Sequence, residues 1–305
     1  MPKIAALGEC MIELAPNNSD SFALGYAGDT LNTAVYLARF GAEVDYLTAL
    51  GTDRFSNAMI SQWQQEGIGT RHVLQMPGRT PGLYLIETDA EGERQFHYWR
   101  ENSPARDLFD LAPELLRSFS DYDIIYLSGI SLSLYSDKAR SLLFKALAQF
   151  RAQGGRVAFD INYRPRNWPN AQQAQAVIGA MLDLTDIALP SLDDEVLLWG
   201  PQTADQCISR YRAHGCNEIV VKQGVEGSRL YTPEVHRTLP VPTRVKPLDT
   251  TAAGDSFNGG YLAARLVNES PEEAVLQGAC CAALVIQHPG AIVPKAIFQG
   301  ALAHD

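Results

Sequence analysis

Short apolar runs alternate with amphipathic segments along most of this chain, and that alternation is the feature that most constrains its fold. The apolar runs have the length of buried strands. They lie at residues 4–7, 44–50, 124–127, 157–161, 187–189 and 219–221. Segments with apolar residues at helical spacing lie between them, at residues 30–40, 139–150, 174–184 and 204–214. This order predicts an α/β fold with a doubly wound, mainly parallel sheet and helices on both faces.

One region interrupts the alternation. β-rich runs at residues 82–88 and 93–100 flank a turn at Asp89-Ala90-Glu91-Gly92, which predicts a hairpin. Residues 20–26 can add a strand to it. We therefore expect a single α/β domain over residues 1–305, with a small β-rich lid formed by insertions at about 13–26 and 80–104.

The hairpin has more aromatic and polar side chains than a purely structural ribbon needs. Alternate residues of a strand share a face, so Phe96, Tyr98 and Arg100 should lie together, and Tyr84 of the other arm can join them. Aromatic rings pack on sugars, and arginine binds carboxylates. The alternative is an oligomer interface, where the same residue types are common.

The charge balance excludes several kinds of partner. The chain has 25 Lys and Arg against 35 Asp and Glu, a formal charge of −10, and no basic run. We therefore expect no nucleic-acid partner and no membrane partner. The five cysteines form no C-x-x-C pair, and the N-terminal segment lacks a signal-peptide pattern. These features predict reduced thiols and a cytoplasmic location.

Small residues precede one carboxylate in the stretch DTTAAGDSFNGG. If Ala252, Ala253 and Gly254 open a helix, their bare amides attract an anion. A carboxylate repels a phosphate, so Asp255 needs another purpose, such as taking a proton from an attacking hydroxyl. The alternative is an ordinary helix start, capped by a side chain of residues 249–250.

Polar residues also follow two of the predicted strands. Asp160, Asn162 and Arg164 alternate at a strand's carboxyl end, where open α/β sheets bind ligands. Ordinary loop polarity is the alternative. Lys222 precedes a turn with Gly224 and Gly227, which is either a structural hairpin or a loop beside a nucleotide.

A further polar group opens the first predicted helix. Gly28 and Asp29 stand at its start, and Asn32 follows one turn later. Asp and Asn hydrogen-bond pairs of hydroxyls, so this segment suits a polyol. Helix capping is the alternative.

Two segments together resemble known signatures. AGDTLNTAVYLARFGAEVDYLTALG is similar to the N-terminal signature of the ribokinase-like (PfkB) carbohydrate kinases, and DTTAAGDSFNGGYL to their C-terminal signature, D-T-x-G-A-G-D. The resemblance covers essentially the whole chain. It implies that residues 252–254 form the anion hole for the γ-phosphate and that Asp255 is the catalytic base.

The resemblance also implies ATP and Mg²⁺ as cofactors, with a monovalent cation in parts of the family. Two departures stand out: Ala252 replaces the usual glycine, and the N-x-x-E motif linked to magnesium appears as Ser191-Leu192-Asp193-Asp194, followed by Glu195. Asp194 matches the spacing of the metal-linked acid. The implied ATP contacts are Ser191, Lys222, Gly224, Gly227, Gly254 and Gly290.

Within the family, GECMIEL, the Tyr98-Trp99-Arg100 run and FDINYRPRNW are similar to the kinases of 2-keto-3-deoxygluconate. That similarity implies ATP-dependent phosphorylation of the terminal hydroxyl of this sugar acid. Arg100 and Arg164 would bind its carboxylate. The implied substrate contacts are Gly28, Asp29, Asn32, Tyr84, Tyr98, Arg100, Asn162, Arg164 and Asp255.

Two alternatives to this activity remain open at this stage. A fructokinase or another sugar-acid kinase of the family would share the motifs. A non-catalytic sugar-binding regulator would keep the pocket, although it would not need Asp255. A β-rich lid also favours pairing of two copies through its strands, so a homo-oligomer is the implied protein partner.

Overall fold

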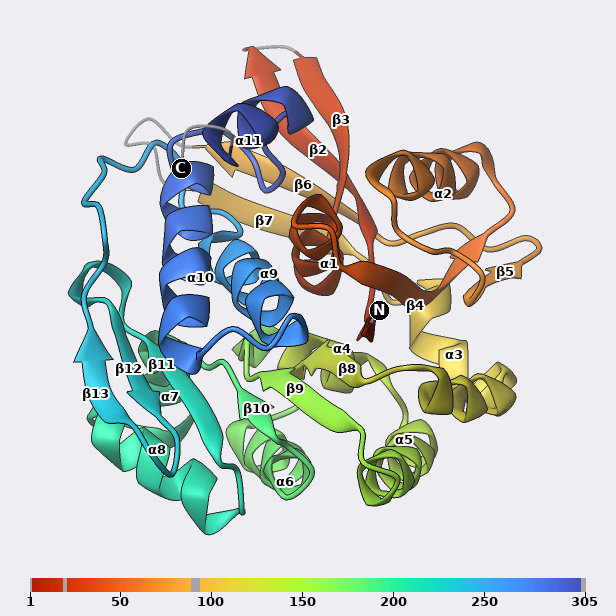
Figure 1. Cartoon of the computed structure of the whole chain (residues 1–305). Coiled ribbons are helices and arrows are strands. Elements are labelled where there is room, and N and C mark those ends of the chain that lie inside the picture. The colour runs from red at the N-terminus through yellow and green to blue at the C-terminus, as the bar shows by residue number, and fades with distance from the viewer. Residues whose placement is uncertain (1, 19–20, 89–93, 303–305) are drawn as a thin grey trace.

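A computed structural model describes residues 2–18, 21–88 and 94–302, whose strands form two sheets (Figure 1). In the large sheet seven neighbouring strands run parallel, and two antiparallel strands complete one edge. In spatial order they are β13 (His236–Leu239), β12 (Ser228–Tyr231), β11 (Glu218–Lys222), β10 (Ile187–Ala188), β9 (Arg156–Asp160), β8 (Ile124–Ser128), β1 (Lys3–Leu7), β4 (Glu43–Gly51) and β5 (Val73–Met76). The six predicted buried strands are confirmed.

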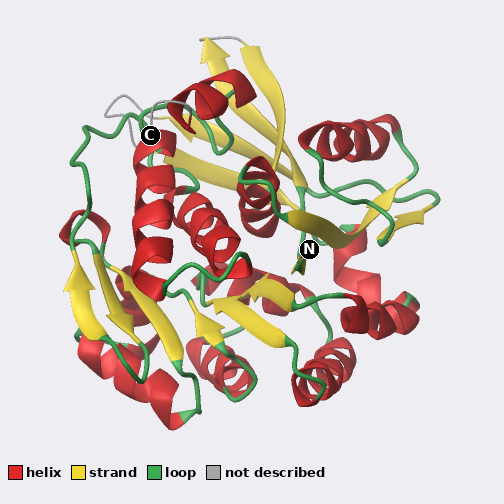
Figure 2. Ribbon diagram, viewed as in Figure 1, coloured by secondary structure: helices red, strands yellow, loops and turns green. Residues whose placement is uncertain are grey.

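Helices cover both faces of this sheet, as predicted (Figure 2). One face carries α1 (Asp29–Arg39), α2 (Arg54–Glu66), α9 (Ala253–Leu266) and α10 (Pro271–Val285). The other carries α3 (Leu108–Leu111), α5 (Asp137–Ala152), α6 (Ala171–Leu182) and α8 (Ala204–Ala213). Shorter or peripheral elements are α4 (Gly129–Leu134), α7 (Leu192–Trp199), α11 (Lys295–Leu302), η1 (Pro104–Asp107), η2 (Pro113–Asp121), η3 (Pro165–Asn167) and η4 (Gly224–Glu226).

Strand β1 shows why the apolar runs lack polar alternation. Ile4 and Ala6 pack in the cluster under α1 and α9, whereas Ala5 and Leu7 pack in the cluster under α5. All four are fully buried. A strand with helices on both sides must be apolar at every position, and each large apolar side chain buried there contributes about 1.5–3 kcal/mol.

The small sheet forms the predicted β-rich lid. Its order is β3 (Ser21–Ala27), β2 (Met11–Asn18), β6 (Leu83–Thr88) and β7 (Arg94–Trp99). The β6–β7 pairing confirms the hairpin, while the turn predicted at Asp89-Ala90-Glu91-Gly92 lies outside the described residues. Strand β2 was not predicted as a separate strand. The assignment of the whole chain to one domain stays a prediction.

The two faces of the lid differ as the sequence predicted. On the inner face Tyr84 stacks on Tyr98 with ring centroids 5.6 Å apart, and Phe96 lies beside them. On the outer face Trp99 is 58% exposed. Among the described residues, no helix is both long and apolar enough to cross a membrane.

Candidate active site

The small-residue stretch opens a helix, as predicted. Ala252 is the N-cap residue of α9, in the left-handed conformation with φ 60°, and the helix begins at Ala253. A Cβ added at Gly254 would lie 3.4 Å from Lys222 Nζ, so glycine leaves this helix start open. The first amides of a helix have no acceptor within it, which makes this end suited to an anion.

The alternative interpretation placed Asp249 or Thr250 at the cap, whereas the N-cap residue of α9 is Ala252, whose side chain makes no capping hydrogen bond. Asp249 instead accepts hydrogen bonds from the amides of Thr251, at 3.0 Å, and Gly290, at 2.7 Å. Gly290, a predicted ATP contact, is thereby tied to the loop that leads into α9.

Asp255 stands in the first turn of α9 and meets the first helix of the chain. Asn32 Nδ2 donates to Asp255 Oδ2 at 2.8 Å. Gly28 allows α1 to begin this close, because a Cβ at Gly28 would lie 2.0 Å from the carbonyl oxygen of Glu9. The start of α1 and the start of α9, two predicted segments that are far apart in the sequence, thus lie side by side.

The surroundings of Asp255 favour its neutral form. Burial is the largest cause that raises its pKa, followed by the negative charge of Asp29 and then that of Asp160. The hydrogen bond from Asn32 and the charge of Lys222 act in the opposite direction. The net effect raises the pKa of Asp255 to about 7, near the value that suits a general base at neutral pH.

Asp29 is held by two donors at the ends of neighbouring strands. Its Oδ2 accepts from Ser128 Oγ at 2.5 Å and from Asn162 Nδ2 at 2.8 Å. Burial raises the pKa of Asp29, and these hydrogen bonds act to lower it. Asn162 has a φ of 31°, so the chain leaves the extended conformation soon after β9.

Lys222 is anchored where β11 ends. Its Nζ donates to Asp160 Oδ2 at 2.8 Å and to Asn258 Oδ1 at 2.9 Å. Asn258, in α9, also donates to Asp160 Oδ2 at 2.7 Å. Asp160 is buried, so this network fixes a cation beside the helix start of Gly254.

Arg164 pairs with an acid of α7 in this structure. Its Nη1 lies 2.7 Å from Asp194 Oδ1. Ser191 caps α7 by accepting the Asp194 amide at 3.2 Å, and it bridges to Lys222 through the backbone. Burial is the main cause that raises the pKa of Asp194, and Arg164 opposes it.

The other two acids of this motif lie differently. Asp193 is exposed, and Glu195 is fully buried against Tyr211 and Arg210, whose hydrogen bonds to it are each 2.7 Å long. Of the three acids, Asp194 is therefore the one that pairs with Arg164. Among the described residues, no group of three or more His, Cys, Asp or Glu is arranged to hold a metal ion.

The glycine turn after Lys222 is a hairpin, which was its structural interpretation. Strands β11 and β12 pair antiparallel around η4. Gly224 and Gly227 both have positive φ, 55° and 91°. Both glycines therefore serve the turn of this hairpin. Their role in nucleotide binding stays a prediction.

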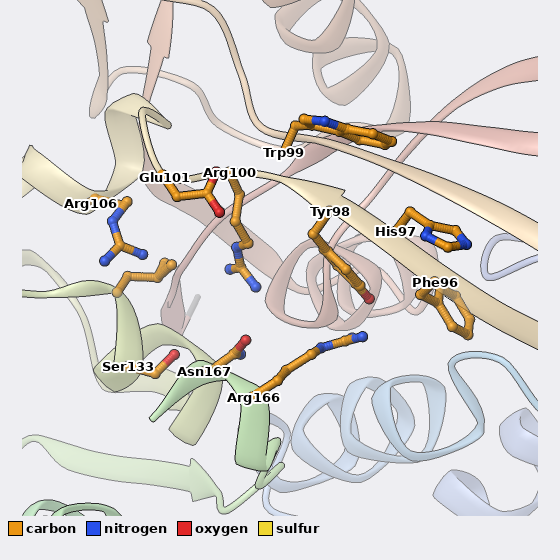
Figure 3. Close-up of a pocket in the computed structure, with 11 residues that line it drawn as sticks. Phe96, His97, Tyr98, Trp99, Arg100, Glu101, Arg106, Ser133, Arg166 and Asn167 are labelled. Carbon is orange, nitrogen blue, oxygen red and sulfur yellow. The ribbon is translucent and has the colours of Figure 1, made fainter. Parts of the chain in front are cut away.

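Under the lid lies a cavity of about 630 Å³ (Figure 3). Tyr98 and Arg100 line it, as does Arg166 of η3, whose guanidinium carbon is 3.8 Å from the centroid of the Tyr98 ring. Tyr98 and Arg100 are the predicted substrate contacts in its lining. The other predicted contacts are not in it: Gly28, Asp29, Asn32, Tyr84, Asn162, Arg164 and Asp255.

Sequence reasoning missed three charged residues of this region. Glu9 is buried and pairs with Arg100, and Glu13 accepts a short hydrogen bond from Tyr84. Arg166 was seen only as part of a motif. The strand register of the lid aligns Glu13 with Tyr84 and Tyr98. The sequence alone could not predict this alignment, because it depends on the pairing of β2 with β6.

The sequence model of the family described as "pfkB family carbohydrate kinase" matches residues 1–297. The chain belongs to this family. The predicted enzyme class, a carbohydrate kinase, and the predicted ribokinase-like resemblance are thereby confirmed.

Individual pfkB relatives are similar over nearly their full lengths. A 2-dehydro-3-deoxygluconokinase of Escherichia coli (strain K12) is 45% identical over 305 residues, which cover 96% of this chain and 97% of the relative. A protein of the same name from Haemophilus influenzae is 41% identical, with 97% and 96% covered.

A solved structure of a pfkB relative confirms the fold. The fructokinase from Vibrio cholerae O395 in its fructose, ADP and calcium ion bound form superposes with a TM-score of 0.83. It shares 26% identity and covers 98% of each chain. That relative binds a sugar, a nucleotide and a metal ion on this fold.

Proposed function

We propose that this pfkB carbohydrate kinase transfers the γ-phosphoryl group of ATP to the terminal hydroxyl of 2-keto-3-deoxygluconate, also called 2-dehydro-3-deoxygluconate. The product is 2-keto-3-deoxy-6-phosphogluconate. The observation that carries the proposal is the position of Asp255, which combines an open helix start with a pKa of about 7. The similarity to relatives named for this activity supports the choice of sugar.

Asp255 acts as the general base. Its Oδ2 is held by Asn32, which leaves Oδ1 as the oxygen that can approach the substrate. The carboxylate takes the proton of the terminal hydroxyl, and that oxygen then attacks the γ-phosphorus. The proton stays on Asp255 until the product has left.

The start of α9 stabilises the charge that develops on the transferred group. The amides of residues 252–254 would donate to its equatorial oxygens, in a direction that the helix dipole supports. Lys222, fixed by Asp160 and Asn258, adds a positive charge beside Gly254. Because these donors are already oriented, they need no rearrangement at the transition state.

Polar groups around Asp255 would hold the sugar hydroxyls. Asn32 Oδ1 is buried and accepts no hydrogen bond from the described residues, so a substrate hydroxyl would satisfy it. Asp29 and Asn162 form a second polar pair close by, next to Gly28. On the lid side, Tyr84 and Tyr98 offer aromatic faces for the carbon chain.

ATP would lie along the edge formed by Ser191, Lys222 and the glycines Gly224, Gly227, Gly254 and Gly290. Mg²⁺ bound with ATP would neutralise charge on its phosphates. Asp194 is the residue that would hold this ion, through water, since Mg²⁺ usually keeps several waters and takes few protein ligands. The described residues form no cluster of metal-binding side chains, which agrees with the preference of Mg²⁺ for few protein ligands. A requirement for a monovalent cation stays a prediction.

The experiment that tests the proposal is ADP release from ATP and Mg²⁺ with 2-keto-3-deoxygluconate, fructose, ribose and gluconate. We expect a strong preference for 2-keto-3-deoxygluconate. A preference for fructose would keep the kinase and overturn the choice of sugar. Binding of a sugar with no turnover of any would favour the regulator.

We propose that the protein works in the cytoplasm.

We also propose that two copies associate through the outer face of the lid. Phe22, Leu24 and Trp99 are each at least half exposed on lid strands. The strand register places Leu24 across from Leu14, and Trp99 across from Leu83, so each of the four strands gives this face an apolar side chain, next to the exposed pair of Glu87 and His97. Light scattering of the wild type and of Leu24→Glu tests the association, and a monomeric wild type would exclude it.

A further inference from the structure

Tyr126 is a buried tyrosine that the proposed reaction does not use. It lies in the middle of β8 and is 1% exposed. The strand register places Ala6 of β1 and Ala158 of β9 beside it, and all three residues pack in the cluster under α1 and α9. Because both neighbours are small, the ring can rise between them toward these two helices, which lie side by side (Figure 1).

The hydroxyl of Tyr126 contacts both helices next to the proposed base. Asn258 Nδ2, of α9, donates to this hydroxyl at 3.1 Å, and Thr33 Oγ1, of α1, lies 3.3 Å from it. Asn258 stands one helical turn after Asp255. Thr33 directly follows Asn32, which holds the Asp255 carboxylate, and Thr33 Oγ1 also lies 3.1 Å from the backbone oxygen of Asp255. Tyr126 therefore touches the two segments that carry the base and its hydrogen-bond partner.

The contact with Tyr126 completes the hydrogen bonds of Asn258. The Oδ1 atom of Asn258 accepts from Lys222 Nζ at 2.9 Å, while its Nδ2 donates to Asp160 Oδ2 at 2.7 Å and to the tyrosine hydroxyl. A side-chain amide has two N–H groups, so both are satisfied here. Asn258 is fully buried, and without the hydroxyl one N–H would lose its acceptor. A movement of Asn258 toward another acceptor would displace Lys222.

The phenol of Tyr126 stays protonated during the reaction. Burial is the largest cause that raises its pKa, followed by the negative charges of Asp160, Asp255 and Asp29. A phenol whose pKa lies above its ordinary value is neutral at the pH at which Asp255 ionises. A neutral hydroxyl of this kind acts on the reaction through the positions of the side chains that it holds.

We propose that Tyr126 is a positioning residue for phosphoryl transfer. Its hydroxyl holds one side chain of α1 and one of α9, and it thereby aligns Asp255 with Lys222. This inference rests on the proposed roles of those two residues and not on which sugar is phosphorylated. Alignment controls the rate because a reacting group misplaced by about 1 Å can lower turnover by about 100-fold.

The test is Tyr126→Phe, which keeps the ring and removes the hydroxyl. We expect kcat to fall by about tenfold, as for a displacement smaller than about 1 Å. KM for 2-keto-3-deoxygluconate and KM for ATP should stay within about twofold, because Tyr126 contacts neither ligand. The loss of kcat should be similar at every pH, since the phenol does not ionise in this range. A loss confined to low pH would mean that the hydroxyl tunes the pKa of Asp255, which would overturn the inference.

Tyr261→Phe is the matched control. Tyr261 is also fully buried and belongs to α9, and its hydroxyl donates to Glu218 Oε1 at 2.7 Å. Glu218 begins β11, whereas Lys222 ends it, so the control removes a buried hydroxyl at the opposite end of the strand from the site. A hydrogen bond to a charged group contributes more to stability than one to a neutral group. The melting temperature should therefore fall at least as far as in Tyr126→Phe, while kcat stays within about twofold of the wild type.

The outcomes separate this inference from the proposed function. A normal kcat in Tyr126→Phe, with or without a lower melting temperature, would overturn the inference. An equal fall of kcat in both variants would also overturn it, because lost stability alone would explain the result. If the wild type phosphorylates fructose, ribose or gluconate instead of 2-keto-3-deoxygluconate, the proposed sugar is wrong, and the same comparison is made with the sugar that reacts. A wild type that phosphorylates none of the four would overturn both proposals.

Discussion

Asn32 Nδ2 lies 2.8 Å from Asp255 Oδ2, although 223 positions separate the two residues. The contact joins the first turns of α1 and α9, which pack on the same face of the sheet. It fixes one oxygen of the carboxylate and leaves the other for a substrate proton. The base of the proposed reaction is thus oriented before any ligand binds.

Replacing Asp255 with Asn should abolish most turnover without abolishing binding. Asn keeps the shape of the side chain but cannot accept the proton of the hydroxyl. We expect kcat to fall by at least about 10²-fold, the scale of a single general base, with KM values little changed. Steady-state ADP release measures this. The control is Glu114→Gln, an exposed acid at the start of η2. Near-normal turnover in Asp255→Asn would remove Asp255 from the role.

The pH dependence of the reaction should report the raised pKa of Asp255. The group must be ionised to act as a base, so kcat/KM should fall as the pH drops below about 7. The charge of Asp29 is one cause of the raised pKa. Asp29→Asn should therefore move the acidic limb to lower pH. If the acidic limb of kcat/KM stays at the same pH in Asp29→Asn, the charge of Asp29 does not raise the pKa of Asp255.

The same raised pKa predicts a cost in stability at neutral and higher pH. Well below pH 3.8, the ordinary pKa of this carboxyl, Asp255 is protonated in both the folded and the unfolded chain and makes no difference. As the pH rises toward 7, the unfolded chain ionises first, so folding becomes less favourable. Asp255→Asn should melt at a higher temperature than the wild type at pH 8. The difference should shrink toward pH 4, and a constant offset at all pH values would argue against the shift.

The spacing of apolar residues in the sequence was enough to predict the strands and the first helices, because each element buries its residues at the regular spacing of its secondary structure. Ile4 and Leu7 of β1 face opposite helix layers, and that requirement is visible in the sequence as an unbroken apolar run. The inner face of the hairpin was predicted equally well. Tyr84 and Tyr98 share it because the hairpin has a local, two-residue period.

The partners of the polar residues could not be predicted by the same reasoning. Asp160, Asn162 and Arg164 were expected to share one face by strand alternation. However, β9 ends at Asp160, and Asn162 has a φ of 31°. Each residue therefore contacts a different acid or base: Lys222, Asp29 and Asp194 respectively. These partners come from distant segments, and only the tertiary fold brings them together.

Ala252 offers a test of the departure from the family motif. A non-glycine residue with a φ of 60° is strained by roughly 1–2 kcal/mol, while a glycine adds about 0.4–1 kcal/mol of entropy to the unfolded chain. Ala252→Gly should therefore raise the free energy of unfolding in urea by up to about 1 kcal/mol. Its neighbour Ala253 is helical, so Ala253→Gly should instead lower it by about 0.5–1 kcal/mol. Destabilisation by both would mean that Ala252 is not strained.

The ion pair of Lys222 and Asp160 should show strong coupling in stability. Asp160 is buried and accepts from Lys222, Asn258 and the Asn162 amide, so Lys222→Met leaves a buried carboxylate with two neutral donors and no cation. Removal of one partner of a buried pair costs about 3–5 kcal/mol.

Adding Asp160→Asn to Lys222→Met removes the uncompensated charge, so the double variant should recover part of that loss. Urea unfolding of the wild type, both single variants and the double variant gives the interaction energy. Turnover should remain low in the double variant even where stability returns, because the cation beside Gly254 is absent. Additive losses of stability would show that the charges of Lys222 and Asp160 act independently. In that case Asn258 and the packing around α9, rather than the ion pair, would keep Asp160 in place.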